Sequence, residues 1–140
     1  MTQVGDALPE WVVEAVDPEK MKLMAALLHD PNPIHLGPDA VRAVGLGDRA
    51  VNQGPSNLGY VQNVLIAWAG SDDAIRAMAM RFAATVFAGD RAIAGGRVSA
   101  VRESDGELLA DCEVWLDAFR PGVATAVRAL SGTATVVVPG

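Results

Sequence analysis

The chain has 140 residues, of which 51% are hydrophobic and 20% are charged, and its formal net charge is −6 with an isoelectric point near 4.7. This length is enough for one domain with a substantial core, so residues 1–140 are expected to form a single domain. The composition is that of a globular protein and excludes a disordered tail or a charge-rich coiled coil. The eleven Lys and Arg residues are scattered singly, which argues against nucleic-acid binding.

Three features indicate a cytoplasmic protein. Cys112 is the only cysteine and cannot form an internal disulfide, and its place in an alternating segment predicts a buried thiol. The first six residues lack the positive region and apolar run of a signal peptide. The longest uncharged run, residues 50–71, contains too many amide and hydroxyl side chains to cross a bilayer.

The first third of the chain predicts one helix after a short extended segment. Residues 7–16 contain the patch Trp11-Val12-Val13, which suits a short strand or an N-terminal arm laid on the core. Asp17 is a candidate N-cap and Pro18 suits the first helical position, so a helix should begin there. The prolines that follow Asp30 should end it.

The middle of the chain predicts a short helix and then a long apolar one. Residues 37–44 read as one or two helical turns before a glycine-rich break. The polar loop 50–57 then leads into a helix over residues 58–69, with Ser56 as the expected N-cap and Gly70 as the stop. This helix is apolar over most of its circumference, so we expect it to be enclosed, most simply by a curved sheet.

The second half of the chain breaks into segments of strand length separated by turn residues. The expected strands are residues 75–87, 91–103, 108–119 and 124–138. The alternation is clearest from Ala110 to Asp117, which predicts one covered face and one wet face. Helices followed by a run of antiparallel strands define an α+β domain, with a sheet wrapped around one long helix.

One stretch, His29-Asp30-Pro31-Asn32-Pro33-Ile34-His35, carries the chemistry of this sequence. Each proline disfavours a helical conformation in the residue before it, so the segment should run extended. A rigid loop is well suited to hold a carboxylate and an imidazole around one water molecule. The alternative is an ordinary proline-rich exit from a helix, because Asp, Asn and Pro are common turn residues.

The run Asp30-x-Asn32-Pro33-Ile34-His35, followed by Leu36, resembles the signature of the MaoC-like, (R)-specific enoyl-CoA hydratases, which add water to a trans-2-enoyl thioester. The resemblance implies the hotdog fold, in which an antiparallel sheet wraps a long central helix. Arg81-Phe82 and Phe87-Ala88-Gly89-Asp90 also stand where these proteins commonly have an Arg-Phe strand and a Gly-Asp turn.

The resemblance further implies the roles of the site residues. Asp30 and His35 would hold and activate the water and return a proton to carbon. Gly54 is the candidate backbone donor to the thioester oxygen, since Pro55 has no N–H. Asn32 is expected to brace the loop, and Ser56 to cap the helix or contact substrate.

A purely structural role is the alternative for both reacting residues. Asp30 could serve just to cap or turn the helix end, and His35 could be a hydrogen-bonded structural histidine. His29 is expected to be a helix C-terminal cation, and Tyr60 and the tryptophans to serve in packing. No metal site is expected, because two histidines and one acid over seven residues do not match zinc spacings.

No cofactor is expected; a coenzyme A thioester would be the substrate, with Arg81, Arg91 or Arg97 as candidate phosphate contacts. Residues 51–70 are also similar to the small subunit of actinobacterial steroid side-chain hydratases, which works with a second MaoC-like chain. This similarity implies a bulky substrate and a heteromer with such a chain, and a homodimer is the other expectation. The alternatives are a non-catalytic or heteromer-dependent subunit that binds acyl thioesters, and a hotdog thioesterase. Acyl length, the direction of the reaction, the choice of coenzyme A or acyl carrier protein, and the oligomer are left open.

Overall fold

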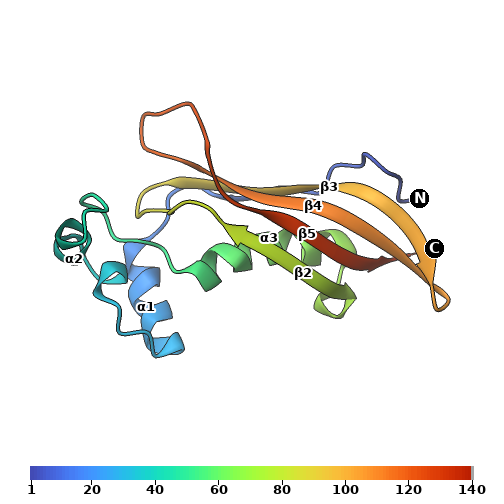
Figure 1. Cartoon of the computed structure of the whole chain (residues 1–140), viewed down its shortest axis with the longest axis horizontal. Coiled ribbons are helices and arrows are strands. Elements are labelled where there is room, and N and C mark those ends of the chain that lie inside the picture. The colour runs from blue at the N-terminus through green and yellow to red at the C-terminus, as the bar shows by residue number, and fades with distance from the viewer. Residues whose placement is uncertain (140) are drawn as a thin grey trace.

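A computed structural model describes residues 1–139 and shows a single curved antiparallel sheet with one long helix along its concave face (Figure 1). The strands are β1 (Trp11–Val13), β2 (Ile75–Phe82), β3 (Arg91–Ser104), β4 (Glu107–Phe119) and β5 (Val127–Val138). Their order across the sheet is β1-β3-β4-β5-β2. The helices are α1 (Pro18–Leu28), α2 (Pro38–Ala43) and α3 (Gly54–Ala69), with 3₁₀ turns η1 (Pro33–His35) and η2 (Asp72–Ala74).

The alternating strands build the core as the sequence predicts. Along β4, Cys112, Val114 and Leu116 point inward and are at most 1% exposed, whereas Glu113 between them is exposed. The inner face packs against α3, in which Val61, Val64 and Leu65 are fully buried. The expected α+β class and hotdog arrangement are therefore confirmed, and Cys112 is a buried free thiol.

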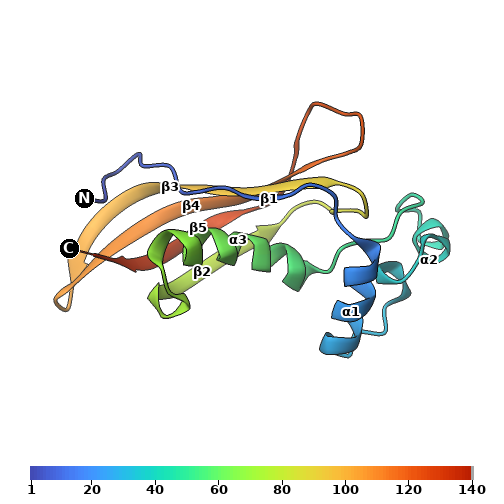
Figure 2. The same cartoon turned by 180° about the vertical axis from the view of Figure 1, so that it is seen from behind.

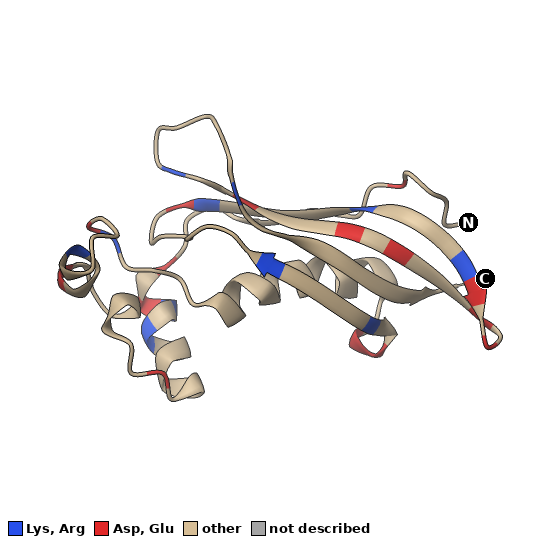
Figure 3. Cartoon of the chain, in the orientation of Figure 1, with Lys and Arg blue, Asp and Glu red and all other residues tan. Residues whose placement is uncertain are grey.

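Charged residues recur along the strands (Figure 3), and those on the outer face, such as Arg97 and Glu113, are exposed to solvent. Pairs of arginine and carboxylate side chains cross neighbouring strands there: Arg97–Glu113, Arg102–Asp111 and Arg128–Asp117. Opposite charges on facing strands add modestly to sheet pairing, and exposed pairs of this kind contribute little to stability.

Helix α3 differs from its prediction in two respects. It begins at Gly54, after Gln53, so the expected start at residue 58 and the N-cap role of Ser56 were wrong. Ser56 is already inside the first turn, because Pro55 is compatible with an early helical position and lets the helix begin before it. The helix is also enclosed on one side only: Gln62 and Ala67 are exposed.

Two strands are shorter than predicted. β2 ends at Phe82, and the chain then leaves the sheet for a turn closed by Asp90, whose carboxylate accepts the Phe87 N–H at 2.9 Å. β5 begins at Val127 rather than residue 124, because the turn at Pro121-Gly122 extends into a longer loop. β1, short as it is, pairs with β3 and confirms the extended N-terminal patch.

The elements α1, η1 and α2 gather at one end of the molecule, next to the first turn of α3 (Figure 2). Within residues 1–139, no helix has both the length and the hydrophobicity needed to cross a bilayer.

Candidate active site

The loop from Asp30 to His35 is held by its own side chains. Helix α1 ends at His29, whose φ of 51° lies in the left-handed region, and the Asp30 N–H donates to Ala25 O at 2.9 Å. The Asp30 Oδ1 atom then accepts the Asn32 N–H at 3.0 Å, and Asn32 Oδ1 accepts the Ile34 N–H at 3.3 Å and caps η1. Consecutive turns of this kind are a common use of Asp and Asn side chains.

This loop brings the two predicted reacting groups together. Asp30 Oδ2 lies 3.4 Å from His35 Nε2. The His35 side chain is 10% exposed and that of Asp30 is 33% exposed, so the pair lies at the edge of the protein interior rather than in open solvent. The five-residue separation thus yields one acid and one imidazole facing the same point.

The other ring nitrogen of His35 fixes the tautomer. Nδ1 lies 2.6 Å from the carbonyl oxygen of Val51. A carbonyl oxygen can only accept, so Nδ1 carries the hydrogen and Nε2 of the neutral ring presents a lone pair toward Asp30. Two acceptors 3.4 Å apart do not bond to each other, but both can accept from one water molecule that lies beside the pair, within hydrogen-bond reach of each.

The predicted oxyanion donor stands close by in the chain. Gly54 is the first residue of α3 and follows Val51 by three positions. No side chain caps this helix, so the amides of its first turn are left for other acceptors. A Cβ atom on Gly54 would lie 3.3 Å from the ring of Phe82, so that ring covers the start of the helix.

Three buried amide side chains beside this helix end are not predicted by the sequence pattern. Asn52, Gln53 and Asn57 are 5%, 1% and 3% exposed. Gln53 Nε2 donates to Met21 O at 2.7 Å and ties the start of α3 to α1. The only sequence signal for them is a run of uncharged polar residues directly before an apolar helix, and such a run equally suits an exposed loop.

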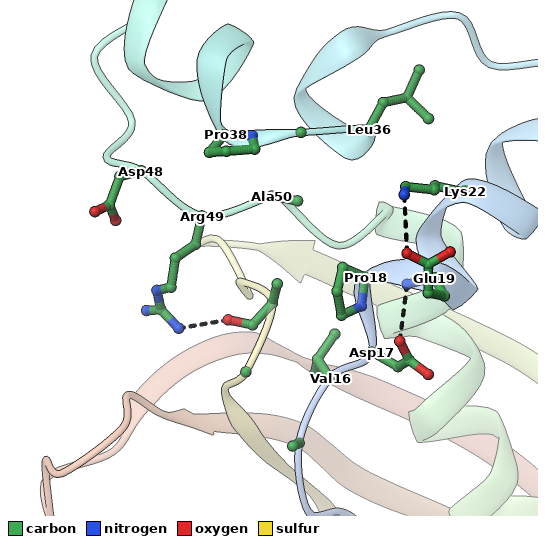
Figure 4. Close-up of a pocket in the computed structure, with 14 residues that line it drawn as sticks. Val16, Asp17, Pro18, Glu19, Lys22, Leu36, Pro38, Asp48, Arg49 and Ala50 are labelled. Carbon is green, nitrogen blue, oxygen red and sulfur yellow. Dashed lines mark hydrogen bonds and ion pairs between the residues drawn. The ribbon is translucent and has the colours of Figure 1, made fainter.

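A cavity of about 750 Å³ lies between the start of α1, residues 36–38 and the chain around Arg49 (Figure 4). Its two basic side chains are already engaged: Lys22 pairs with Glu19 at 2.9 Å, and Arg49 donates to Ala88 O at 2.7 Å. Arg49 also pairs with Asp90. The cavity therefore offers limited free positive charge.

The predicted phosphate contacts are dispersed. Arg91 pairs with Glu14 at 3.1 Å, and Arg97 with Glu113 at 2.9 Å. Arg81 lies exposed near the end of β2, next to Phe82, and makes no ion pair within residues 1–139. The structure does not bring these three arginines into one cluster.

A family model described as the MaoC like domain matches residues 3–110. Together with an antiparallel sheet curved around a central helix, this match defines a protein of the hotdog class. The chain belongs to the MaoC-like domain family. Among curated proteins, no sequence match was found.

Several solved structures superpose on nearly the whole chain. The ChsH1-ChsH2 complex from Mycobacterium tuberculosis gives a TM-score of 0.81 at 23% identity, covering 99% of this chain and 100% of that one. An (R)-hydratase from A. caviae involved in PHA biosynthesis gives a TM-score of 0.81 at 23% identity, covering 99% and 98%. The HadBC (3R)-hydroxyacyl-ACP dehydratase complex from M. tuberculosis gives 0.70 at 15% identity, covering 98% of each chain. At these identities the likeness shows the shared fold.

Proposed function

We propose that this protein adds water to a trans-2-enoyl thioester, or removes water from the corresponding 3-hydroxyacyl thioester. The observation that carries the proposal is the approach of His35 Nε2 to Asp30 Oδ2 at 3.4 Å, while Nδ1 is held by Val51 O. This arrangement presents two acceptors to one water molecule, which is what activation of water as a nucleophile requires.

In the proposed reaction, the water oxygen forms a bond to the β-carbon while Asp30 and His35 take one of its protons. The electron pair of the double bond moves toward the thioester carbonyl, so negative charge develops on its oxygen. The Gly54 N–H and the positive end of α3 stabilise that charge. A proton returned to the α-carbon from the same pair completes the addition.

Membership in the MaoC-like family supports hydratase or dehydratase chemistry, and several similar structures are described as hydratases or dehydratases. Coenzyme A or an acyl carrier protein would carry the acyl group, and the reaction as written needs no cofactor. Exposed Arg81 is the most available of the three arginines for a phosphate of the carrier, because the other two already pair with carboxylates.

We further propose that the chain acts in the cytoplasm as a homodimer or with a second MaoC-like chain. Two of the similar structures are complexes of two named chains. The sheet ends at β2, whose outer edge has no neighbouring strand within residues 1–139. Open edges of this length are commonly covered in the working protein.

Replacement of either reacting group tests the proposal. Asp30→Ala and His35→Ala are each expected to lower kcat for hydration of crotonyl-CoA or a bulkier enoyl-CoA by about two to four orders of magnitude. His29→Ala is the matched control, since it removes the only other histidine, which is exposed. Turnover near the wild-type rate in either of the first two variants would refute the assignment.

The heteromeric relative ChsH1-ChsH2 favours one alternative, a subunit that binds acyl thioesters and depends on a partner for turnover. Incubation of the purified chain with enoyl-CoA esters of graded bulk separates the two functions. Product formed by the chain alone supports the hydratase, whereas tight binding without product supports the partner-dependent subunit. Release of free thiol would instead indicate a thioesterase.

A further inference from the structure

A cavity of about 410 Å³ lies on the flank of α3 that the sheet leaves uncovered. It begins at the first turn of the helix, at Ser56, and extends to Ile66. Its opposite wall comes from β1 and α1, which contribute Trp11 and Met24. At 1.5 Å per residue, the helix side of this cavity is about 15 Å long.

A hydrogen-bonded group of side chains forms one end of the cavity. Asn52 Nδ2 donates to Asn57 Oδ1 at 2.7 Å and to the Tyr60 hydroxyl at 3.2 Å. These two bonds use both hydrogens of the Asn52 amide. The Tyr60 hydroxyl thereby accepts one bond and has no other partner within residues 1–139, so its own hydrogen is free to be donated.

The Tyr60 hydroxyl stays protonated over the physiological range. Burial raises its pKa above the ordinary value of a tyrosine, and the hydrogen bond from Asn52 lowers it by a smaller amount. Desolvation disfavours the phenolate, which explains the direction. The group is therefore a hydrogen-bond donor at neutral pH.

Gly59, one residue earlier, also lines this cavity. A glycine inside a helix costs about 0.5–1 kcal/mol relative to alanine. A Cβ atom at Gly59 would have no neighbour within 4 Å, so close packing does not explain the glycine. Its effect is to leave space in the cavity.

The walls combine apolar and polar groups. Trp11 and Ile66 offer apolar surface, while Tyr60 and Asn63 offer polar atoms. A plain hydrocarbon would cover these polar groups without pairing them, which is unfavourable. Sites built to hydrogen-bond a ligand oxygen discriminate against the analogue that lacks it.

We propose that this cavity binds the acyl group of the thioester and that the Tyr60 hydroxyl donates a hydrogen bond to a keto or hydroxyl oxygen on that group. The proposal rests on the proposed hydration and names its substrate class, which is acyl groups that carry an oxygen substituent. Tyr60 is a binding residue here, outside the Asp30–His35 pair.

The test compares trans-2-octenoyl-CoA with its 5-oxo and 7-oxo derivatives. The wild-type protein is expected to favour at least one oxo ester about tenfold in kcat/KM, the value of roughly one good hydrogen bond. Tyr60→Phe keeps the ring and removes the oxygen, and it should abolish that preference. Thr135→Val is the matched control, because it removes a half-buried hydroxyl that bonds Asp111 on the outer face.

Gly59 provides an independent arm. Gly59→Ala should raise the melting temperature, because alanine favours the helix more than glycine and its Cβ atom would meet no neighbour within 4 Å. Gly59→Leu should raise KM or Kd for the octenoyl esters, because the larger side chain would fill the cavity. Equal kcat/KM for the three esters in the wild type, or an oxo preference that survives in Tyr60→Phe, would overturn the proposal.

The same esters separate failure of this proposal from failure of the proposed hydration. If no ester is hydrated, isothermal calorimetry measures their binding to the wild-type chain and to Tyr60→Phe. Tighter binding of an oxo ester that is lost in the variant supports the cavity assignment without any turnover. Absent binding, or equal binding of all three esters, contradicts it.

Discussion

His35 is oriented by the backbone on one side and faces the Asp30 carboxylate on the other. The Val51 carbonyl holds Nδ1 at 2.6 Å, and Val51 N in turn donates to Ile34 O at 2.8 Å, so the two segments fix each other. Val51 also bridges to Phe87 in the turn that follows β2. The geometry of the imidazole therefore depends on residues far from it in the sequence.

Asp90 makes the side-chain contacts that hold that turn together. Its carboxylate is fully buried and binds Arg49, Arg120 and the Phe87 N–H. Asp90→Asn leaves two guanidinium groups without their anion, and should lower the free energy of unfolding by about 3–5 kcal/mol in urea titrations. Asp39→Asn, which removes the fully exposed partner of Arg42, is the control with little effect. A similarly small loss for Asp90→Asn would show that the turn does not depend on the charge.

Cys112 predicts a specific pH dependence of stability. Burial raises the pKa of its thiol to about 11, so the folded state keeps the proton in a range where an unfolded thiol loses it. The unfolded state then binds fewer protons, and stability falls as pH rises from about 9 to about 11. Urea titrations over this range should show a flatter dependence for Cys112→Ala than for the wild type. Parallel curves for the two proteins would contradict the assignment.

At the scale of elements, the contact between β2 and β5 depends on one glycine. A Cβ atom on Gly132 would lie 2.0 Å from the Ala79 carbonyl oxygen. Gly132→Ala must therefore separate the strands, and we expect a loss of about 1–3 kcal/mol or more in the free energy of unfolding. The measurement is chemical denaturation followed by circular dichroism.

Gly37→Ala is the control for this change, because a Cβ atom there would meet nothing within 4 Å and its backbone is extended. Comparable losses in the two variants would mean that glycine content, rather than the close approach of β2, sets the effect. Gly59 in helix α3 is the opposite case, because a Cβ atom there would meet no neighbour within 4 Å.

At the scale of the whole molecule, the surface divides into a charged outer sheet face and a helical end with exposed apolar side chains. Leu23 and Leu27 on α1 are 62% and 69% exposed, and Phe82 at the end of β2 is 53% exposed. Exposed apolar side chains that form a contiguous patch commonly mark an interaction site. Their elements adjoin the candidate site, because α1 leads into the Asp30 loop and the Phe82 ring lies against Gly54.

We therefore expect the purified chain to associate. Sedimentation at micromolar concentration should give at least twice the 14.6 kDa mass of one chain, or should do so once a second MaoC-like chain is added. A chain that remains monomeric while it hydrates enoyl-CoA at full rate would contradict the proposed dimer or heteromer.

Local chemistry determined much of this protein from its sequence. The alternation in β4, the start of α1 after Asp17 and the proline-braced loop follow from residue types and spacing, and the structure has all three. The motif also placed Asp30 and His35 on one rigid loop, where the structure holds them 3.4 Å apart. Such features are predictable because each depends on residues close together in the chain.

Only the tertiary structure decided the rest, because those contacts join residues that are distant in the chain. The bond from His35 to Val51 O spans sixteen positions, and the one from Gln53 to Met21 O spans thirty-two. The open flank of α3 and its cavity depend on where β1 and α1 come to lie. The tautomer of His35 and the free hydroxyl of Tyr60 are set by such contacts, since hydrogen-bond partners form only after folding has brought them together.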